Sequence, residues 1–223
     1  MVALEAVLTR VHAALAEYGL LLESDRNLPS VATLTVGAPV PGSWWSHPLS
    51  HTIYAVTREL ARDPRSVSVK LIQGKVTWVD RTLWPALLAV ARAREPWQMQ
   101  VLSNDARRLF AELTRLGEMR TDEIRSRSPA GRLAGELEKV LLIHSADIHT
   151  ASGAHARQLE SWERWMENKR YRPKEIAPAV AKSTLERAFL RLPGASPDMR
   201  SLPWQRTPDR RRLAVAKLVR AEA

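Results

Sequence analysis

The first residues of the chain combine apolar and polar positions in the pattern of an α-helix. Over residues 2–18 the apolar residues recur at intervals close to 3.6, and Glu5, Arg10 and Glu17 fall elsewhere on the helical wheel. This pattern predicts an amphipathic helix that ends near Gly19. Comparable patterns and helix-capping residues predict further helices over residues 50–61, 82–94, 103–116, 121–127, 128–140, 177–191 and 209–221.

Runs of β-branched and alternating residues mark the expected strands. Val31–Val36 is a β-branched run among prolines and glycines, which predicts a short strand followed by an irregular loop. Two alternating segments flank Gln73-Gly74, a dipeptide typical of tight turns, so residues 66–80 are predicted to form a β-hairpin. A second hairpin is expected around a turn at residues 151–153.

The order of these elements predicts the architecture. Three expected helices followed by a hairpin are the plan of a winged helix-turn-helix, and the helix and hairpin within residues 50–80 suggest a degenerate second copy. The predicted fold class is mainly α with small β-hairpins (α+β), arranged as tandem winged helix-turn-helix units plus C-terminal helices. The expected domains are an N-terminal helix with the degenerate unit (1–97), a winged helix-turn-helix unit (98–166) and a basic C-terminal helical extension (167–223).

The net charge of the chain indicates what kind of partner it binds. The chain of 223 residues carries 34 Lys and Arg against 24 Asp and Glu, a formal charge of +10. The net charge is −2 over residues 1–50, +4 over 51–97, 0 over 98–166 and +8 over 167–223. This excess predicts a polyanionic partner, DNA in duplex or structured form, although a genome biased towards Arg would produce a similar surface.

Several chemistries are disfavoured by what the sequence lacks. The absence of cysteine rules out disulfides, thiol catalysis and cysteine-based metal sites, and the six histidines show no HExxH spacing, so we expect no metal and no cofactor. The sequence contains no Walker, Rossmann or GxSxG motif. Without a long apolar stretch or a secretion signal, we expect a cytoplasmic, nucleoid-associated protein that does not contact a membrane.

The candidate DNA contacts are basic residues of the two predicted units. In a winged helix the third helix enters the major groove and the wing touches phosphates or the minor groove. The alternatives are solvated surface charge for the first unit and, for the electrically neutral second unit, a packing or protein-binding role. The candidates are Arg58, Arg62, Arg65, Lys70, Lys75 and Arg81 in the first unit and Arg125, Arg127, Arg132 and Arg157 in the second.

The loop GSWWSHP, residues 42–48, contains the adjacent Trp44 and Trp45. Their rings could stack on an extruded or unpaired base, anchor a partner protein, or fold back over the core. Tryptophans inside regular elements are expected in the core instead, and the spacing of Trp162 and Trp165 places both on one helix face.

Three segments carry a family resemblance: GSWWSHP, KLIQGKVTWVDRTLWPALLAVARAREPWQ and LEKVLLIHSADIHTASGAHARQLESWERW. Together they resemble a bacterial family of uncharacterised winged-helix proteins that is distantly similar to AlkZ-type crosslink-repair DNA glycosylases. The resemblance spans roughly residues 25–166, and it implies tandem winged helices and duplex DNA, including damaged DNA, as the partner. Those glycosylases use two glutamine-type residues spaced i, i+2 in an N-terminal unit. The matching pair here, Gln98 and Gln100, lies between the two modules, which favours coincidence.

The sequence thus predicts a DNA-binding protein that acts mainly through phosphate contacts, in DNA repair or damage recognition. One alternative is a glycosylase-like enzyme acting on an extruded base, for which Asp80, Asp147 and Gln98 are the candidate catalytic residues. The other is a protein-interaction module that uses the Trp44/Trp45 loop.

Overall fold

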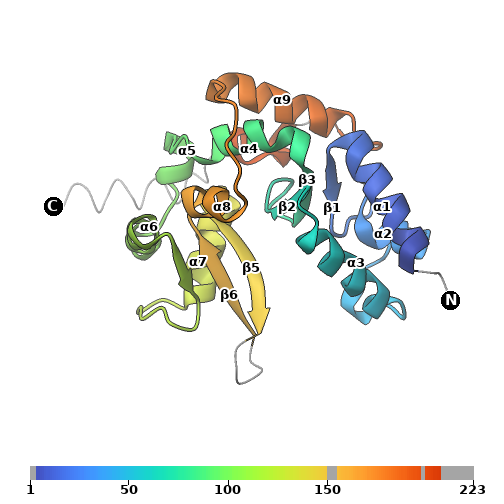
Figure 1. Cartoon of the computed structure of the whole chain (residues 1–223), viewed down its shortest axis with the longest axis horizontal. Helices are drawn as coiled ribbons and strands as arrows, with labels where there is room; N and C mark the ends of the chain where they lie inside the picture. Colours follow the sequence, from blue (N-terminus) through green and yellow to red (C-terminus); the bar gives the residue numbers. More distant parts are fainter. Residues whose placement is uncertain (1–3, 150–154, 197–198, 207–223) are drawn as a thin grey trace. The chain divides into compact units, whose positions relative to one another are not determined.

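The computed structural model describes residues 4–149, 155–196 and 199–206 (Figure 1). The chain divides into two compact units, and each combines two separate stretches of sequence. Unit 1 comprises residues 1–90 and 171–199, and unit 2 comprises residues 91–170 and 200–223. The residues after 170 are therefore shared between the two units.

Both units combine helices with a three-stranded antiparallel sheet, so the chain has the α+β class that the sequence predicts. Unit 1 runs helix, strand, helix, helix, strand, strand, and then adds two more helices. The strands lie in the order β1-β3-β2. The elements are α1 (Leu4–Tyr18), β1 (Leu20–Leu22), α2 (Val31–Val36), α3 (Ser50–Arg62), β2 (Ser66–Val69), β3 (Thr77–Asp80), α4 (Trp84–Ala91) and α9 (Pro178–Leu190), with 3₁₀ turns at Trp44–Ser46 and Arg81–Leu83.

The strand predicted at residues 31–36 is wrong, because this segment forms the helix α2. The side chain of Ser30 accepts a hydrogen bond from the N–H of Thr33 and so caps the first turn. Gly37 ends the helix in the left-handed conformation at φ 87°, and its N–H donates to the carbonyl of Thr33. A cap at both ends outweighs the preference of β-branched residues for strands.

The hairpin predicted over residues 66–80 is confirmed by the pairing of β2 with β3. Gln73 and Gly74 both have positive φ, 53° and 71°, as the two central residues of a type I′ turn do. The N–H of Lys75 donates to the carbonyl of Ile72 at 2.9 Å and closes the turn.

The core of unit 1 lies between α1, α2, α3 and the sheet. Helix α9 adds a buried face of its own. The loop after α9 approaches the loop between β1 and α2, where a Cβ on Gly194 would lie 2.5 Å from the carbonyl oxygen of Asn27. One buried cluster of unit 1 contains Val7, Val11, Leu15, Leu21, Val31, Val56, Leu60 and Trp78.

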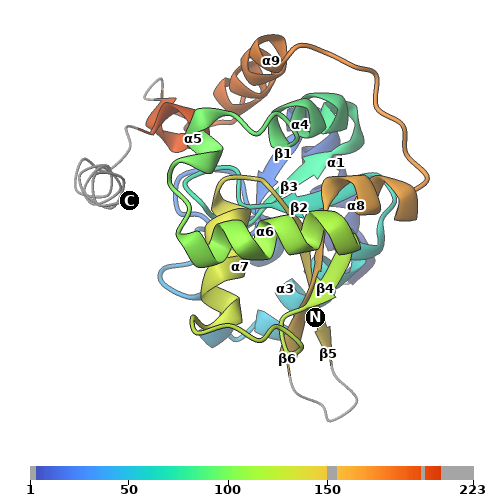
Figure 2. The same cartoon turned by 90° about the vertical axis from the view of Figure 1, so that its left-hand side faces the viewer.

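From α6 to α8, unit 2 repeats the order of α1 to α4 in unit 1, except that a turn stands where unit 1 has α2. Its sheet order, β4-β6-β5, is equivalent to that of unit 1. In Figure 2, α6 lies across α7, and β5 and β6 run side by side. The elements are α5 (Pro96–Met99), α6 (Asn104–Leu116), β4 (Glu118–Arg120), α7 (Ala130–Lys139), β5 (His144–His149), β6 (His155–Glu160) and α8 (Trp162–Asn168), with 3₁₀ turns at Met199–Ser201 and Pro203–Gln205.

The short helix predicted over residues 121–127 is wrong. Thr121 continues the pairing of β4 instead: its N–H donates to the carbonyl of Arg157, and its hydroxyl accepts from the N–H of Arg157. The hydroxyl that the sequence assigns to a helix cap is therefore used by the sheet. The side chain of Arg120, the last residue of β4, pairs with Asp122 in the turn that follows the strand.

The other predicted helices within the described residues are confirmed as α1, α3, α4, α6, α7 and α9, with small shifts at their ends. Ser103 caps α6 as expected, by accepting from the N–H of Ala106. Trp162 and Trp165 are both buried on α8. The predicted turn at residues 151–153 and the last predicted helix, 209–221, lie outside the described residues.

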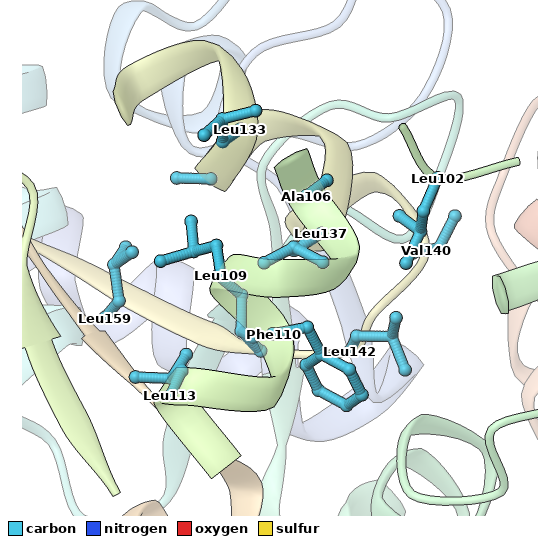
Figure 3. Close-up of a cluster of buried hydrophobic side chains, with 12 residues drawn as sticks. Leu102, Ala106, Leu109, Phe110, Leu113, Leu133, Leu137, Val140, Leu142 and Leu159 are labelled. Atoms are coloured by element: carbon cyan, nitrogen blue, oxygen red, sulfur yellow. The ribbon is translucent and has the colours of Figure 1, made fainter. Parts of the chain in front are cut away.

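The core of unit 2 forms where α6 and α7 pack on β6 (Figure 3). Leu109 and Leu113 of α6 face Leu133 and Leu137 of α7, and Leu159 of β6 completes this layer. None of the helices in the described part of the chain is long and apolar enough to cross a membrane.

Candidate nucleic-acid interface

The exposed face of α3 carries two of the candidate contacts. Ile53, Val56, Thr57 and Leu60 are buried against the rest of unit 1. Tyr54, Arg58 and Arg62 are spaced by four residues, so they follow one another along the opposite, exposed side of the helix. The structure thus brings two of the predicted cations, Arg58 and Arg62, onto one helix face.

Tyr54 and Arg58 are in contact on this face. The guanidinium carbon of Arg58 lies 5.9 Å from the centroid of the Tyr54 ring, within the range of a cation–π interaction. Arg62 pairs with Glu59 at 3.0 Å, and both side chains are largely exposed. An exposed pair of this kind contributes little to stability, so Arg62 can exchange Glu59 for another anion at low cost.

The two tryptophans before α3 have different roles. Trp44 is 6% exposed, belongs to a small core cluster with Ala32, Val40 and Ile53, and donates its ring N–H to Glu23 at 3.3 Å. Trp45 is 63% exposed, and its ring is stacked on Trp44 with centroids 3.9 Å apart. Trp44 therefore covers the core, and Trp45 presents an aromatic surface to solvent.

Trp45 and α3 form one continuous surface. The Trp45 ring lies 5.8 Å from the ring of Tyr54, which is itself 38% exposed and sits beneath Arg58. We call Trp45, Tyr54 and Arg58 the aromatic strip. Sequence reasoning missed Tyr54, although its i, i+4 spacing from Arg58 on an amphipathic helix would have identified it.

Two further cations of unit 1 are held by acidic partners within the chain. Lys75 pairs with Asp25 at 2.6 Å, and the Asp25 side chain is only 6% exposed. Arg65 pairs with Asp63 at 2.9 Å, next to His12. The hydrogen bond from Arg65 outweighs the opposing effect of burial and holds the pKa of Asp63 below its usual value.

The remaining candidates of unit 1 lie on other parts of its surface. Lys70 follows β2 directly and is partly buried. Arg81 follows β3, and its guanidinium lies 5.4 Å from the ring of Trp84 and 5.3 Å from that of Tyr171. Partial burial of the Tyr171 side chain raises its pKa. The stacking of Arg81 on two rings gives it a clear structural role.

The candidates of unit 2 likewise include exposed cations and cations that are paired with acidic side chains. Arg125 and Arg127 are exposed in the turn segment between β4 and α7. Arg132 pairs with Glu136 at 3.5 Å on the exposed side of α7. Arg157 pairs with the buried Glu138 and donates to the carbonyl of Gly131 at 2.8 Å, so it joins β6 to α7 inside the unit.

The three candidate catalytic residues of the glycosylase alternative have different surroundings. Gln98 is fully buried, and its amide donates both hydrogens, to the carbonyls of Ala91 and Val140. This side chain therefore cannot reach a base or position a water against one. Asp80 accepts from the N–H and the hydroxyl of Thr82, and Asp147 is exposed on β5.

No group of three or more His, Asp or Glu side chains suited to a metal ion occurs among the residues that the structure describes. The surface formed by α3 and the Trp45 loop instead presents two guanidinium groups, of Arg58 and Arg62, and two aromatic rings, of Trp45 and Tyr54. This combination can bind phosphate and stack on a planar ring.

Comparison with known proteins adds no relative: no protein-family model, no curated protein and no solved structure matches the chain.

Proposed function

We propose that the chain binds duplex DNA, with unit 1 acting as a winged helix-turn-helix that places α3 in the major groove. The observation that carries this proposal is the exposed face of α3, on which Arg58 and Arg62 lie one turn apart. One helical turn spans about 5.4 Å, which is short enough for both guanidinium groups to reach neighbouring phosphates or base edges.

The topology of unit 1 supports this orientation. In a winged helix the helix that precedes the hairpin is the one that enters the groove, and here that helix is α3, followed directly by β2 and β3. The sheet order β1-β3-β2 places the first strand beside the last, as a compact helix–sheet unit of this kind requires. The resemblance of three sequence segments to a winged-helix family points to the same fold.

Unit 2 has a weaker case for direct contact. The helix equivalent to α3 is α7, and its Arg132 shares the exposed side with Glu136, while Glu138 takes Arg157 out of reach. Residues 98–166 also have no net charge. We therefore assign the main DNA contact to unit 1.

The test is a binding measurement on a fluorescently labelled duplex at low salt. Arg58→Glu should weaken binding at least about tenfold, because it replaces an attraction to phosphate by a repulsion. Arg115→Glu is the matched control, since it changes the net charge equally at an exposed position of α6. No detectable binding by the wild type, or an equal loss in both variants, would refute the proposal.

A further inference from the structure

Trp45 is an exposed aromatic ring that the core of unit 1 does not use. Its neighbour Trp44 supplies the buried contacts, and the loop holds Trp45 with nearly two thirds of its surface in solvent. A tryptophan is among the costliest residues to leave exposed, because its large apolar surface remains hydrated. The loop therefore holds the Trp45 ring in an exposed position, which indicates that a ligand covers the ring.

The ring is held in a fixed orientation. Trp44 stacks on one of its faces at 3.9 Å with an interplanar angle of 24°, and Trp44 is anchored by its hydrogen bond to Glu23. Serine capping of α2 and the packing of Ala32 and Ile53 fix the elements on either side of the loop. Trp45 therefore loses little conformational entropy when a ligand stacks on it.

The neighbouring charges define the chemistry of this ligand. The strip runs from Trp45 through Tyr54 to Arg58, with Arg62 one turn further along α3. A ligand that fits it combines a planar ring with an attached anion, which is the chemistry of a nucleotide. A protein partner would need an acidic segment with an aromatic side chain, a less direct match to this order of groups.

We propose that Trp45 stacks on an unpaired nucleobase next to the duplex that α3 contacts. Bases inside an intact duplex present only their edges, because both of their faces are already stacked on neighbours. Trp45 can therefore accept a base only where the strand is gapped or the base is extruded. This inference rests on the proposed DNA binding, and it adds a preference for DNA that contains unpaired bases.

The test compares a fully paired duplex with the same duplex interrupted by a short single-stranded gap. Wild-type protein should bind the gapped DNA about tenfold more tightly, in keeping with the effect of one aromatic stacking contact. Trp45→Ala should lose this preference and keep its affinity for the paired duplex. Trp45→Phe, which retains an aromatic ring, should restore part of the preference.

A fluorescent adenine analogue in the gap provides a second measurement. Its emission should be quenched by the wild type and by Trp45→Phe, and not by Trp45→Ala. If Trp45→Ala keeps the preference and the quenching, the stacking proposal is wrong while DNA binding by α3 stands, and a protein partner becomes the explanation for the exposed ring. If the wild type binds neither DNA, the proposed function fails and the inference fails with it.

Discussion

At the scale of single residues, Asp25 ties two loops of unit 1 together. One carboxylate oxygen accepts from the N–H groups of Asn27 and Leu28, at 2.8 and 3.0 Å, and the other accepts from Lys75 in the β2–β3 turn. Burial raises the pKa of Asp25, but the hydrogen bonds from Lys75 and the two backbone N–H groups outweigh it, so the pKa lies below its usual value.

Because of this lowered pKa, the stability of unit 1 should decrease in the acid pH range. In the unfolded chain Asp25 takes up its proton near pH 3.9, whereas the native state takes it up at lower pH. The ionised Asp25 contributes its full stabilisation above the unfolded-state pKa, and this stabilisation is lost as the pH falls through the lower native-state pKa.

Asp25→Asn should therefore lower the free energy of unfolding at neutral pH by about 1–3 kcal/mol and flatten its decline below about pH 4. Urea unfolding followed at a series of pH values measures both effects. Asp147→Asn, which removes a carboxylate from an exposed position on β5, is the control. Parallel curves for the wild type and Asp25→Asn would show that this pair does not cause the acid sensitivity.

At the scale of elements, hydrophobic periodicity predicted the helices whose stability comes from one buried face, such as α1 and α6. It failed where a polar side chain decided the structure. Ser30 converts a β-branched run into α2, and Thr121 gives its hydroxyl to the sheet rather than to a helix cap. In both cases the decisive side chain is compatible with either outcome, and its actual partner determines which one occurs.

The candidate site shows the same limit. Arg58 and Arg62 could be predicted because they lie on one amphipathic helix, where spacing alone defines the exposed face. The partners of Lys75 and Arg157, which are Asp25 and Glu138, lie far away in sequence, so no local pattern reveals that these cations are already paired. The separate roles of Trp44 and Trp45 depend on how one loop folds.

The contact between the loop after α9 and the β1–α2 loop gives a test at this scale. Gly194 has φ 80°, and an added Cβ would lie 2.5 Å from the carbonyl oxygen of Asn27. Gly194→Ala should combine left-handed strain with this clash and cost about 2–4 kcal/mol of stability. Gly37→Ala is the matched control, since Gly37 has φ 87° with open space around its Cβ position, and it should cost about 1–2 kcal/mol.

Urea unfolding followed by tryptophan fluorescence compares the two glycine variants. An equal loss in both would mean that the loop after α9 adjusts freely, and that α9 is not held against the β1–α2 loop by this close approach.

At the scale of the whole molecule, net charge alone is a poor guide to where DNA would bind. The +10 of the chain includes cations that serve the fold, such as Lys75 with Asp25 and Arg157 with Glu138. Such pairs contribute nothing to counterion release, because the local charge of each pair is already balanced. The distribution of unbalanced cations, rather than their sum, should determine how binding responds to salt.

This distinction leads to a prediction about the salt dependence of DNA binding. Each phosphate neutralised by a cation adds about −0.9 to the slope of log Kobs against log salt concentration. Arg58→Gln should therefore make the slope shallower by about 0.9. Arg115→Gln and Lys75→Gln lower the net charge equally and should leave the slope of the wild type unchanged, because Arg115 lies on α6 and Lys75 is engaged with Asp25. Binding isotherms over a range of salt concentrations measure the slopes, and three equal changes would instead show that binding follows the overall charge of the molecule.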